Sequence, residues 1–182
     1  MMRDLFGLAL IFLVACREDT QPKPEGYFRL TYPDATYKKE KYIHFTFEQN
    51  TFSSTQSAQK DTPKVVYSNM KATLYLTYNS VHNNLDSLLN DAYKLPYKHI
   101  AKAESIPEKI FINEDKKVFG TLFSVVGNAA SQHQFFLTDS LRHFLVGSLY
   151  FYAKPNYDSI YPAVRYIEKD IVRLMETLEW SN

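Results

Sequence analysis

Cysteine is almost absent from this sequence, because Cys16 is the only one among 182 residues. A single cysteine excludes an intramolecular disulfide and a cysteine-based metal cage. A domain without disulfides must be stabilised by its own hydrophobic core. The chain after Cys16, about 165 residues, is long enough for one such core and short for two.

The sequence also lacks an excess of charge of either sign. It holds 21 lysine and arginine residues against 20 aspartate and glutamate residues, which gives a formal net charge of +1. Nucleic-acid-binding domains usually carry a clear basic excess. We therefore expect no nucleic-acid partner.

A hydrophobic run long enough to span a membrane is missing as well. The apolar run Leu5–Val14 would rise about 15 Å as a helix, half of a bilayer core. Together with Arg3 before it, this run has the form of a secretory signal. The residues Leu13–Cys16 are similar to the bacterial lipobox, in which the cysteine receives a diacylglyceryl group before cleavage. We expect a signal peptide over residues 1–15 and a lipid anchor with acyl chains such as palmitate on Cys16. The alternatives are an ordinary signal peptide with a chance cysteine and a buried N-terminal helix.

The segment 16–25 is polar, contains two prolines and is interpreted as a lipidated tether before a single globular domain over residues 26–182. The nine residues after Cys16 reach roughly 30 Å when fully extended. We expect a membrane-anchored lipoprotein of the cell envelope that faces the periplasm. The choice between inner and outer membrane is open, and Arg17-Glu18-Asp19 leaves surface exposure as an alternative.

Strand character is frequent, as the 14 tyrosines and 13 phenylalanines suggest. The predicted strands are 27–30, 42–47, 70–78, 109–112, 118–126, 134–137 and 143–152. The turn formers Gly127-Asn128 and Asp139-Ser140 separate the last three, which predicts an antiparallel meander. The stretch Asn50–Lys60, rich in serine, threonine and glutamine, is predicted to be an exposed loop.

Two ranges place apolar residues at helical spacing. The range 85–95 follows the cap candidates Asn83 and Asn84, and we expect Pro96 to end it. The range 160–178 is longer and follows the cap candidates Asp158 and Ser159, with Pro162 in the first turn. Its charged face is expected to be solvated, and comprises Arg165, Glu168, Lys169, Arg173 and Glu176.

These elements predict an α+β fold, in which an antiparallel β-sheet packs against a long C-terminal α-helix and one shorter helix. The element order is similar to that of PsbP/Mog1-like sandwiches, which is an analogy of fold only.

No familiar catalytic or metal-binding motif is present. The histidines show no HExxH or HxH spacing and are interpreted as exposed strand or loop residues: His44, His82, His99, His133 and His143. A hairpin could bring His133 near His143, and a hydrolase set of Ser131, His133, Asp139 and His143 can be imagined, but no G-x-S-x-G motif supports it.

The loop after Gly127 has one glycine, so we predict a strand connection with Gly127 at positive φ rather than a phosphate loop. We expect no catalytic, metal-binding or cofactor-binding residue.

Four tyrosines recur every five residues, at positions 27, 32, 37 and 42. This spacing matches neither a helix nor a strand. Packing onto the core is the favoured interpretation, and an aromatic surface for a partner is the alternative.

Two markers in the sequence point to a known family. The first is Pro22–Arg29, just after the cysteine. The second begins at Gly127–Ser131 and continues through Gln134–Ser140, His143–Leu145, Gly147, Leu149–Phe151 and Pro155-Asn156 to Glu176–Leu178 and Trp180. Together they resemble the gliding motility lipoprotein GldD family of Bacteroidota over nearly the whole mature chain. The resemblance implies a non-enzymatic envelope component needed for gliding and associated with type IX secretion, and only Cys16 transfers as a functional position.

Two functions follow as hypotheses. The favoured one is a lipid-anchored assembly or interaction component, with protein partners in the gliding and type IX secretion machinery. The alternative is a membrane-tethered small-ligand-binding protein or envelope hydrolase, which would need a concave polar site between sheet and helix.

Overall fold

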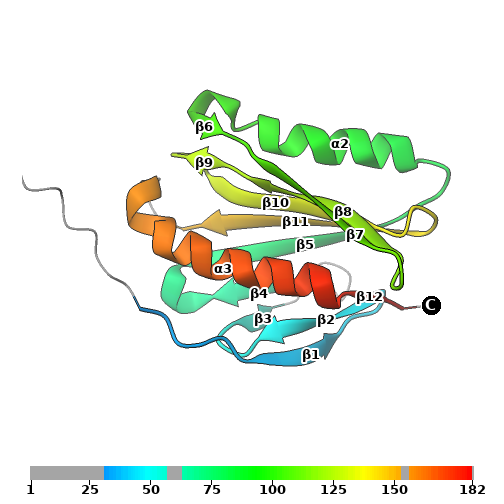
Figure 1. Ribbon diagram of the computed structural model, residues 1–182, viewed down its shortest axis with the longest axis horizontal. Helices are drawn as coiled ribbons and strands as arrows, with labels where there is room; N and C mark the ends of the chain where they lie inside the picture. Colours follow the sequence, from blue (N-terminus) through cyan, green and yellow to red (C-terminus); the bar gives the residue numbers. More distant parts are fainter. Residues whose placement is uncertain (1–30, 57–62, 153–155, 182) are drawn as a thin grey trace, which may run out of the picture.

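The computed structural model describes residues 31–56, 63–152 and 156–181 (Figure 1). The predicted signal peptide, Cys16, the predicted tether and the predicted strand 27–30 lie outside the described residues. No helix in the described part of the chain is long and apolar enough to cross a membrane.

A seven-stranded antiparallel sheet forms the centre of the molecule, with strand order β3-β4-β5-β11-β10-β8-β7. Its strands are β3 (Ser54–Gln56), β4 (Lys64–Tyr67), β5 (Ala72–Ser80), β7 (Glu108–Asn113), β8 (Val118–Ser124), β10 (Ser131–Thr138) and β11 (His143–Phe151). The strands β8, β10 and β11 are neighbours joined in sequence order, so the predicted antiparallel meander is confirmed.

Two smaller sheets flank the large one. One pairs β1 (Tyr37–Lys41), β2 (Phe45–Asn50) and β12 (Glu179–Trp180), and the other pairs β6 (Ala103–Ser105) with β9 (Val126–Gly127). The predicted strand 42–47 is displaced, because the chain turns between β1 and β2. The strand β1 was missed because its sequence, YKKEK, is mostly charged and shows no apolar alternation.

The long C-terminal helix α3 (Tyr157–Thr177) is confirmed, but its start differs from the prediction. The N-cap is Asn156, whose side chain accepts a hydrogen bond from the Ser159 backbone N–H. Asp158 and Ser159 therefore lie inside the first turn. Pro162 falls in the second turn, where its missing N–H removes one helical hydrogen bond. With two α-helices beside antiparallel sheets in the described part of the chain, the α+β class is confirmed.

The main core lies between α3 and one face of the large sheet. The helix contributes Ile167, Ile171 and Leu174, and the sheet contributes Leu74 and Leu145, all almost inaccessible to solvent. Phe45 and Phe47 of β2 close the same core from the side. At about 25 cal/mol per Å² of apolar surface, this burial is the dominant stabilising term.

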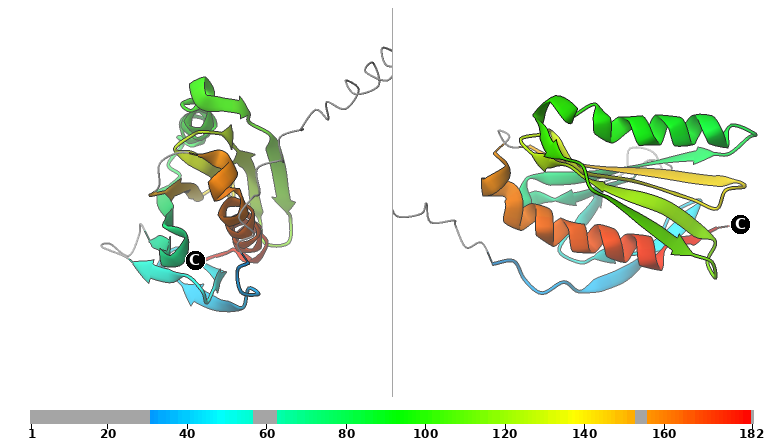
Figure 2. Two further views of the ribbon diagram at one scale, coloured as in Figure 1. Left: turned by 90° about the vertical axis from the view of Figure 1, so that its left-hand side faces the viewer. Right: turned by 45° about the horizontal axis from the view of Figure 1, so that its top comes forward.

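The shorter helix α2 (Leu85–Tyr97) packs on the opposite face of the sheet, as Figures 1 and 2 show. Its Ala92 meets a second cluster made by Phe123, Phe136 and Phe144. Two details of the predicted helix were wrong. Asn84 occupies the N-cap position but its side chain accepts from the His82 backbone N–H instead, and the helix continues through Pro96 to Tyr97.

The stretch predicted as an exposed loop, Asn50–Lys60, is partly wrong. Asn50 and Ser53 are buried, and Ser54–Gln56 form the edge strand β3. Residues 57–62 lie outside the described residues. Polar composition misled the prediction here, because these side chains make hydrogen bonds inside the fold, including Gln49 to Ser53 at 3.1 Å.

Candidate functional site

The imagined hydrolase set is divided between the two ends of the β10–β11 hairpin. Ser131 pairs with Tyr150 and His133 with Leu149, whereas Asp139 and His143 lie at the turn. Six residue steps of about 3.4 Å separate the two histidines along the hairpin, or roughly 20 Å. The hairpin therefore does not bring His133 and His143 together. Within the described residues, no group of three His, Cys, Asp or Glu side chains is arranged to hold a metal ion.

His133 is buried between β10 and α3, with 3% of its surface exposed, so its interpretation as an exposed residue was wrong. Its Nδ1 lies 3.2 Å from Ser124 Oγ on β8. Burial lowers the pKa of His133 to about 4, and the positive charge of Arg165 acts in the same direction. The nearby Val164 backbone opposes this shift. The ring Nε2 is buried and has no hydrogen-bond partner among the described residues. The ring is therefore neutral at pH 7 and serves as a packed polar contact under the helix.

His143 is also buried and belongs to an aromatic cluster at the other end of the hairpin. Its Nδ1 lies 2.7 Å from the Tyr78 hydroxyl, and its ring stacks on Trp180 with centroids 5.0 Å apart. His44 stacks on the far side of Tyr78 at 4.0 Å. Burial lowers the pKa of His143. Because these rings come from the turn before β2 and from β5, β11 and β12, the cluster fixes the C-terminal strand against the sheet.

Asp139 shapes the turn between β10 and β11 rather than a reaction site. Its Oδ1 accepts the backbone N–H groups of Leu141, Arg142 and His143, all within 2.9 Å. Burial would raise the pKa of Asp139, but these three donors outweigh it and the pKa is lowered. Ser140 adopts the left-handed conformation that such a turn requires, which confirms the predicted turn.

Gly127 has the positive φ that the sequence predicted, at 119°. It lies in β9 beside β6, where a Cβ would meet the Lys102 carbonyl oxygen at 2.6 Å. The glycine is needed for this close backbone approach, and the loop after it joins two strands as expected.

A buried carboxylate, Asp170, accepts hydrogen bonds from side chains of several elements. It lies on the core side of α3 and accepts hydrogen bonds from the hydroxyl of Tyr37 (2.8 Å) and the side-chain amide of Asn50 (2.9 Å). Tyr67 also donates to it. Burial raises the pKa of Asp170, although these donors oppose the shift. Through these three donors Asp170 connects α3 to the small sheet, by Tyr37 and Asn50, and to the large sheet, by Tyr67.

The three described tyrosines of the five-residue series pack onto the same region. Tyr32 lies against Tyr166 at 5.2 Å, Tyr37 reaches Asp170, and Tyr42 stacks near Phe47 at 5.4 Å. The favoured interpretation, packing onto the core, is confirmed for Tyr32 and Tyr42, whereas Tyr37 hydrogen-bonds to the buried Asp170 and Tyr27 lies outside the described residues.

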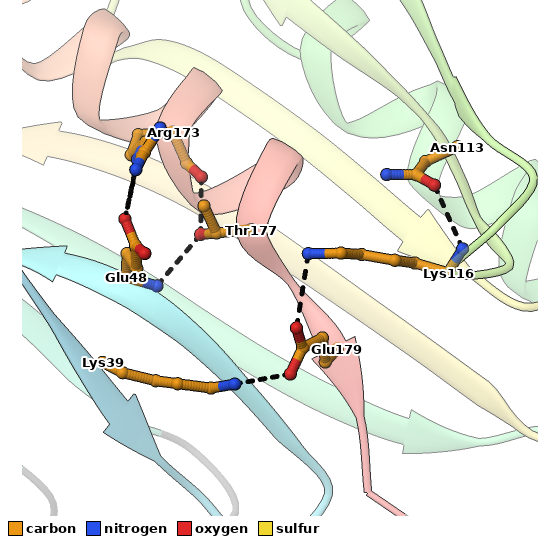
Figure 3. Close-up of polar contacts among 7 residues, drawn as sticks. All are labelled: Lys39, Glu48, Asn113, Lys116, Arg173, Thr177 and Glu179. Atoms are coloured by element: carbon orange, nitrogen blue, oxygen red, sulfur yellow. Dashed lines mark hydrogen bonds and ion pairs between the residues drawn. The ribbon is translucent and has the colours of Figure 1, made fainter.

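Exposed ion pairs close the junction between α3, the small sheet and the β7–β8 turn (Figure 3). Arg173 of α3 binds Glu48 of β2 through two hydrogen bonds, at 2.5 and 2.8 Å. Glu179 of β12 lies between Lys39 at 2.6 Å and Lys116 at 3.4 Å. Solvent-exposed pairs of this kind contribute about 0–1 kcal/mol each. The junction is therefore interpreted as structural.

The described surface has three hollows that could hold a ligand. One of about 290 Å³ lies over the charged face of α3, and one of about 120 Å³ lies between α3 and the edge of the large sheet. The third, about 360 Å³, lies beside Tyr75 and Tyr150. Neither His133 nor His143 lines any of them. The convergent polar site that an envelope hydrolase would need is not formed by the residues that the sequence offered for it.

The third hollow belongs to a group of aromatic residues that we call the tyrosine surface: the half-buried Tyr75 and the exposed Tyr150 and Tyr152. The side chains of Tyr75 on β5 and Tyr150 on β11 project from the α2 face of the sheet, because their neighbours Leu74 and Leu149 face the core on the α3 side. The hydroxyls of Tyr75 and Tyr152 form a hydrogen bond, and the rings of Tyr75 and Tyr150 meet edge to face at 5.8 Å. The Lys64 ammonium lies 5.2 Å above the Tyr75 ring. Exposed, mutually supported tyrosines are typical of protein-binding surfaces.

Sequence reasoning missed Asp170 and the tyrosine surface. An aspartate among the apolar positions of a long amphipathic helix was a readable signal for the first. The tyrosine surface had no such signal, because β5 and β11 are distant in sequence. The exposure of its side chains depends on which part of the sheet α2 covers.

A family model described as "Gliding motility lipoprotein GldD" matches residues 17–180. No curated protein matches. No solved structure matches either, so the PsbP/Mog1-like sandwich stays a prediction.

Proposed function

Because the chain belongs to the GldD family of gliding motility lipoproteins, we propose that it is a lipid-anchored, non-catalytic component that supports assembly of the gliding and type IX secretion machinery. The single observation that carries this proposal is the family match over residues 17–180, which spans nearly all of the described residues. Lipidation of Cys16 would hold the domain at a membrane of the cell envelope, on the periplasmic side. The tether of nine residues then keeps it within roughly 30 Å of the bilayer.

The described surface supports an interaction role. The tyrosine surface offers rigid aromatic contacts that lose little conformational entropy on binding. The residues that suggested hydrolysis serve other purposes: Ser131 bonds to the His133 backbone at 3.4 Å, Asp139 holds a turn, and both histidines are buried. The hydrolase alternative has lost its motivation from these four residues.

Deletion of the gene tests the proposal directly. Loss of surface spreading, or of secretion of type IX cargo, restored by the wild-type gene, is the expected result. Normal spreading and normal secretion in a clean deletion strain would sink it.

A matched pair of complementing variants tests the hydrolase alternative. Ser131→Ala removes the imagined nucleophile and one long hydrogen bond, so it should restore function fully. Ser53→Ala, another buried serine that donates to the Asn50 backbone at 2.7 Å, controls for the loss of a buried hydroxyl. Loss of function with Ser131→Ala alone, at normal protein level, would favour the enzyme.

A further inference from the structure

The outer edge of β7 is a free strand edge with an apolar character. In the order of the large sheet β7 is terminal, and no described strand follows it. Ile110 and Ile112 are 72% and 65% exposed there, which is unusual for two isoleucines two positions apart. Long exposed edges with apolar side chains are templates for pairing with another strand, and proteins normally block them with charge, proline or a cover.

The register of β7 identifies which backbone groups point outward. Ser124 N–H donates to the Pro107 carbonyl at 3.0 Å, so residues 107 and 124 face each other through a hydrogen bond. Such pairs alternate along an antiparallel ladder. Lys109, Phe111 and Asn113 therefore bond toward β8, whereas Ile110 and Ile112 direct their N–H and C=O groups away from the sheet.

A hollow of about 120 Å³ lies beside this edge on its α3 side. Its apolar lining comes from Phe111, Leu122, Val172 and Met175, with Lys109 and Glu176 also in the wall. A strand placed next to β7 would direct alternate side chains to the two faces of the sheet. The side chain opposite Phe111 would point toward the hollow, and those opposite Ile110 and Ile112 would cover the two exposed isoleucines.

Charge decides between a second copy of this chain and a different partner. Two β7 edges paired antiparallel about Phe111 would match Ile110 with Ile112, but Glu108 of each copy would meet Glu114 of the other. Like charges directly opposite one another are destabilising. A partner strand with an acidic residue opposite Lys109 and a basic residue opposite Glu108 has no such conflict.

We propose that the β7 edge binds an extended segment of a partner protein by strand addition. That segment carries three consecutive apolar residues followed by an acidic and a basic residue. Backbone hydrogen bonds supply affinity, and the hollow and the charged end of β7 supply specificity. The inference rests on the proposed interaction role, but binding at β7 is measured without any motility or secretion assay, so the two can fail separately.

A peptide built from this pairing provides the probe. Antiparallel to β7 it is Thr-Val-Leu-Val-Glu-Lys, with leucine opposite Phe111, and the control peptide Thr-Val-Leu-Val-Lys-Glu exchanges the two charges. Binding is measured with the full-length lipoprotein in detergent. The expected result is saturable binding of the first peptide at least tenfold tighter than the control. No binding, or equal binding of both peptides, overturns the proposal.

Two variants locate the binding edge. Ile110→Pro removes one outward N–H without losing a bond to β8, so it should keep the melting temperature and weaken binding at least tenfold. Ile112→Lys, which keeps every backbone group, should weaken binding in the same direction if the proline variant fails to fold. Unchanged binding in a folded variant overturns the proposal. A wild-type dimer that Ile110→Pro converts to a monomer overturns it in favour of a second copy.

Discussion

A buried hydrogen bond joins Asn50 of β2 to Asp170 of α3, with Asn50 Nδ2 donating to Asp170 Oδ2 at 2.9 Å across 120 residues of sequence. Of the small sheet, only β12 follows α3 directly in the chain, whereas β1 and β2 come from the start of the described residues. The position of β1 and β2 against the helix is therefore stabilised by this bond, by the Tyr37 hydroxyl that reaches the same carboxylate, and by the Arg173–Glu48 pair. The Tyr67 hydroxyl connects β4 of the large sheet to this carboxylate.

Replacing Asp170 with alanine should destabilise the protein by about 3 kcal/mol. Three donors would lose their acceptor in an interface that excludes water, and unsatisfied buried polar groups are costly. Urea unfolding at pH 7 measures the effect. Lys169→Ala, at the neighbouring exposed position of α3, is the control and should change stability by less than about 0.5 kcal/mol. A loss below about 1 kcal/mol for Asp170→Ala would show that the network is dispensable.

The buried imidazole of His133 should make stability depend on pH. Its pKa of about 4 in the folded protein lies below the ordinary value of 6.5, so the unfolded chain takes up this proton first as pH falls. The contribution of the neutral His133 to the free energy of unfolding is fully present above pH 6.5 and is lost as the pH falls to 4. The loss amounts to about 3 kcal/mol. Unfolding free energies of wild type and His133→Gln, measured at pH 7 and pH 4.5, should converge or cross in acid. A constant difference between the two proteins would contradict the prediction.

The tyrosine surface should matter for function and little for folding. Tyr150 and Tyr152 are 37% and 61% exposed, so the double alanine variant should retain its melting temperature within a few degrees. Alanine at interface tyrosines typically costs about 2 kcal/mol of binding at a hot spot, so spreading or cargo secretion should drop severely in a complemented deletion strain. Tyr161→Ala, exposed to a similar extent on α3, is the matched control. Wild-type spreading and secretion by the double variant would exclude this surface as an essential contact.

Serine at position 16 should release the protein from the membrane. The thiol of Cys16 is the only side chain in the sequence that can accept the diacylglyceryl thioether, and two acyl chains are needed for stable anchoring. Metabolic labelling with a palmitate analogue and fractionation of membranes should show no label and a shift of the protein out of the membrane fraction. Arg17→Ala should retain label and membrane association. A labelled Cys16→Ser protein would place the lipid elsewhere.

The periodic parts of the chain were predictable because their neighbours are local or repeat regularly. Apolar alternation located β5, and turn formers placed β8, β10 and β11 in sequence order as a meander. The helix α3 was visible from apolar steps of three and four over its length. The predicted ends of the helices were less reliable. Asn156 caps α3 by accepting from the Ser159 N–H, whereas the side chain of Asn84 accepts from the His82 N–H and does not cap α2. Only the folded turn decides which of these hydrogen bonds forms.

The sequence by itself determined the α+β class and the family, and it predicts Cys16 as the position of the lipid, because these depend on order along the chain. Only the tertiary structure decided that His133 and His143 stand at opposite ends of a hairpin, that Asp170 is a buried tie, and that β7 ends the sheet with Ile110 and Ile112 exposed. Those features depend on which strands become neighbours. Strand order is set by packing among residues that can be more than 100 positions apart, such as Thr46 and Glu179, and no local sequence pattern encodes it.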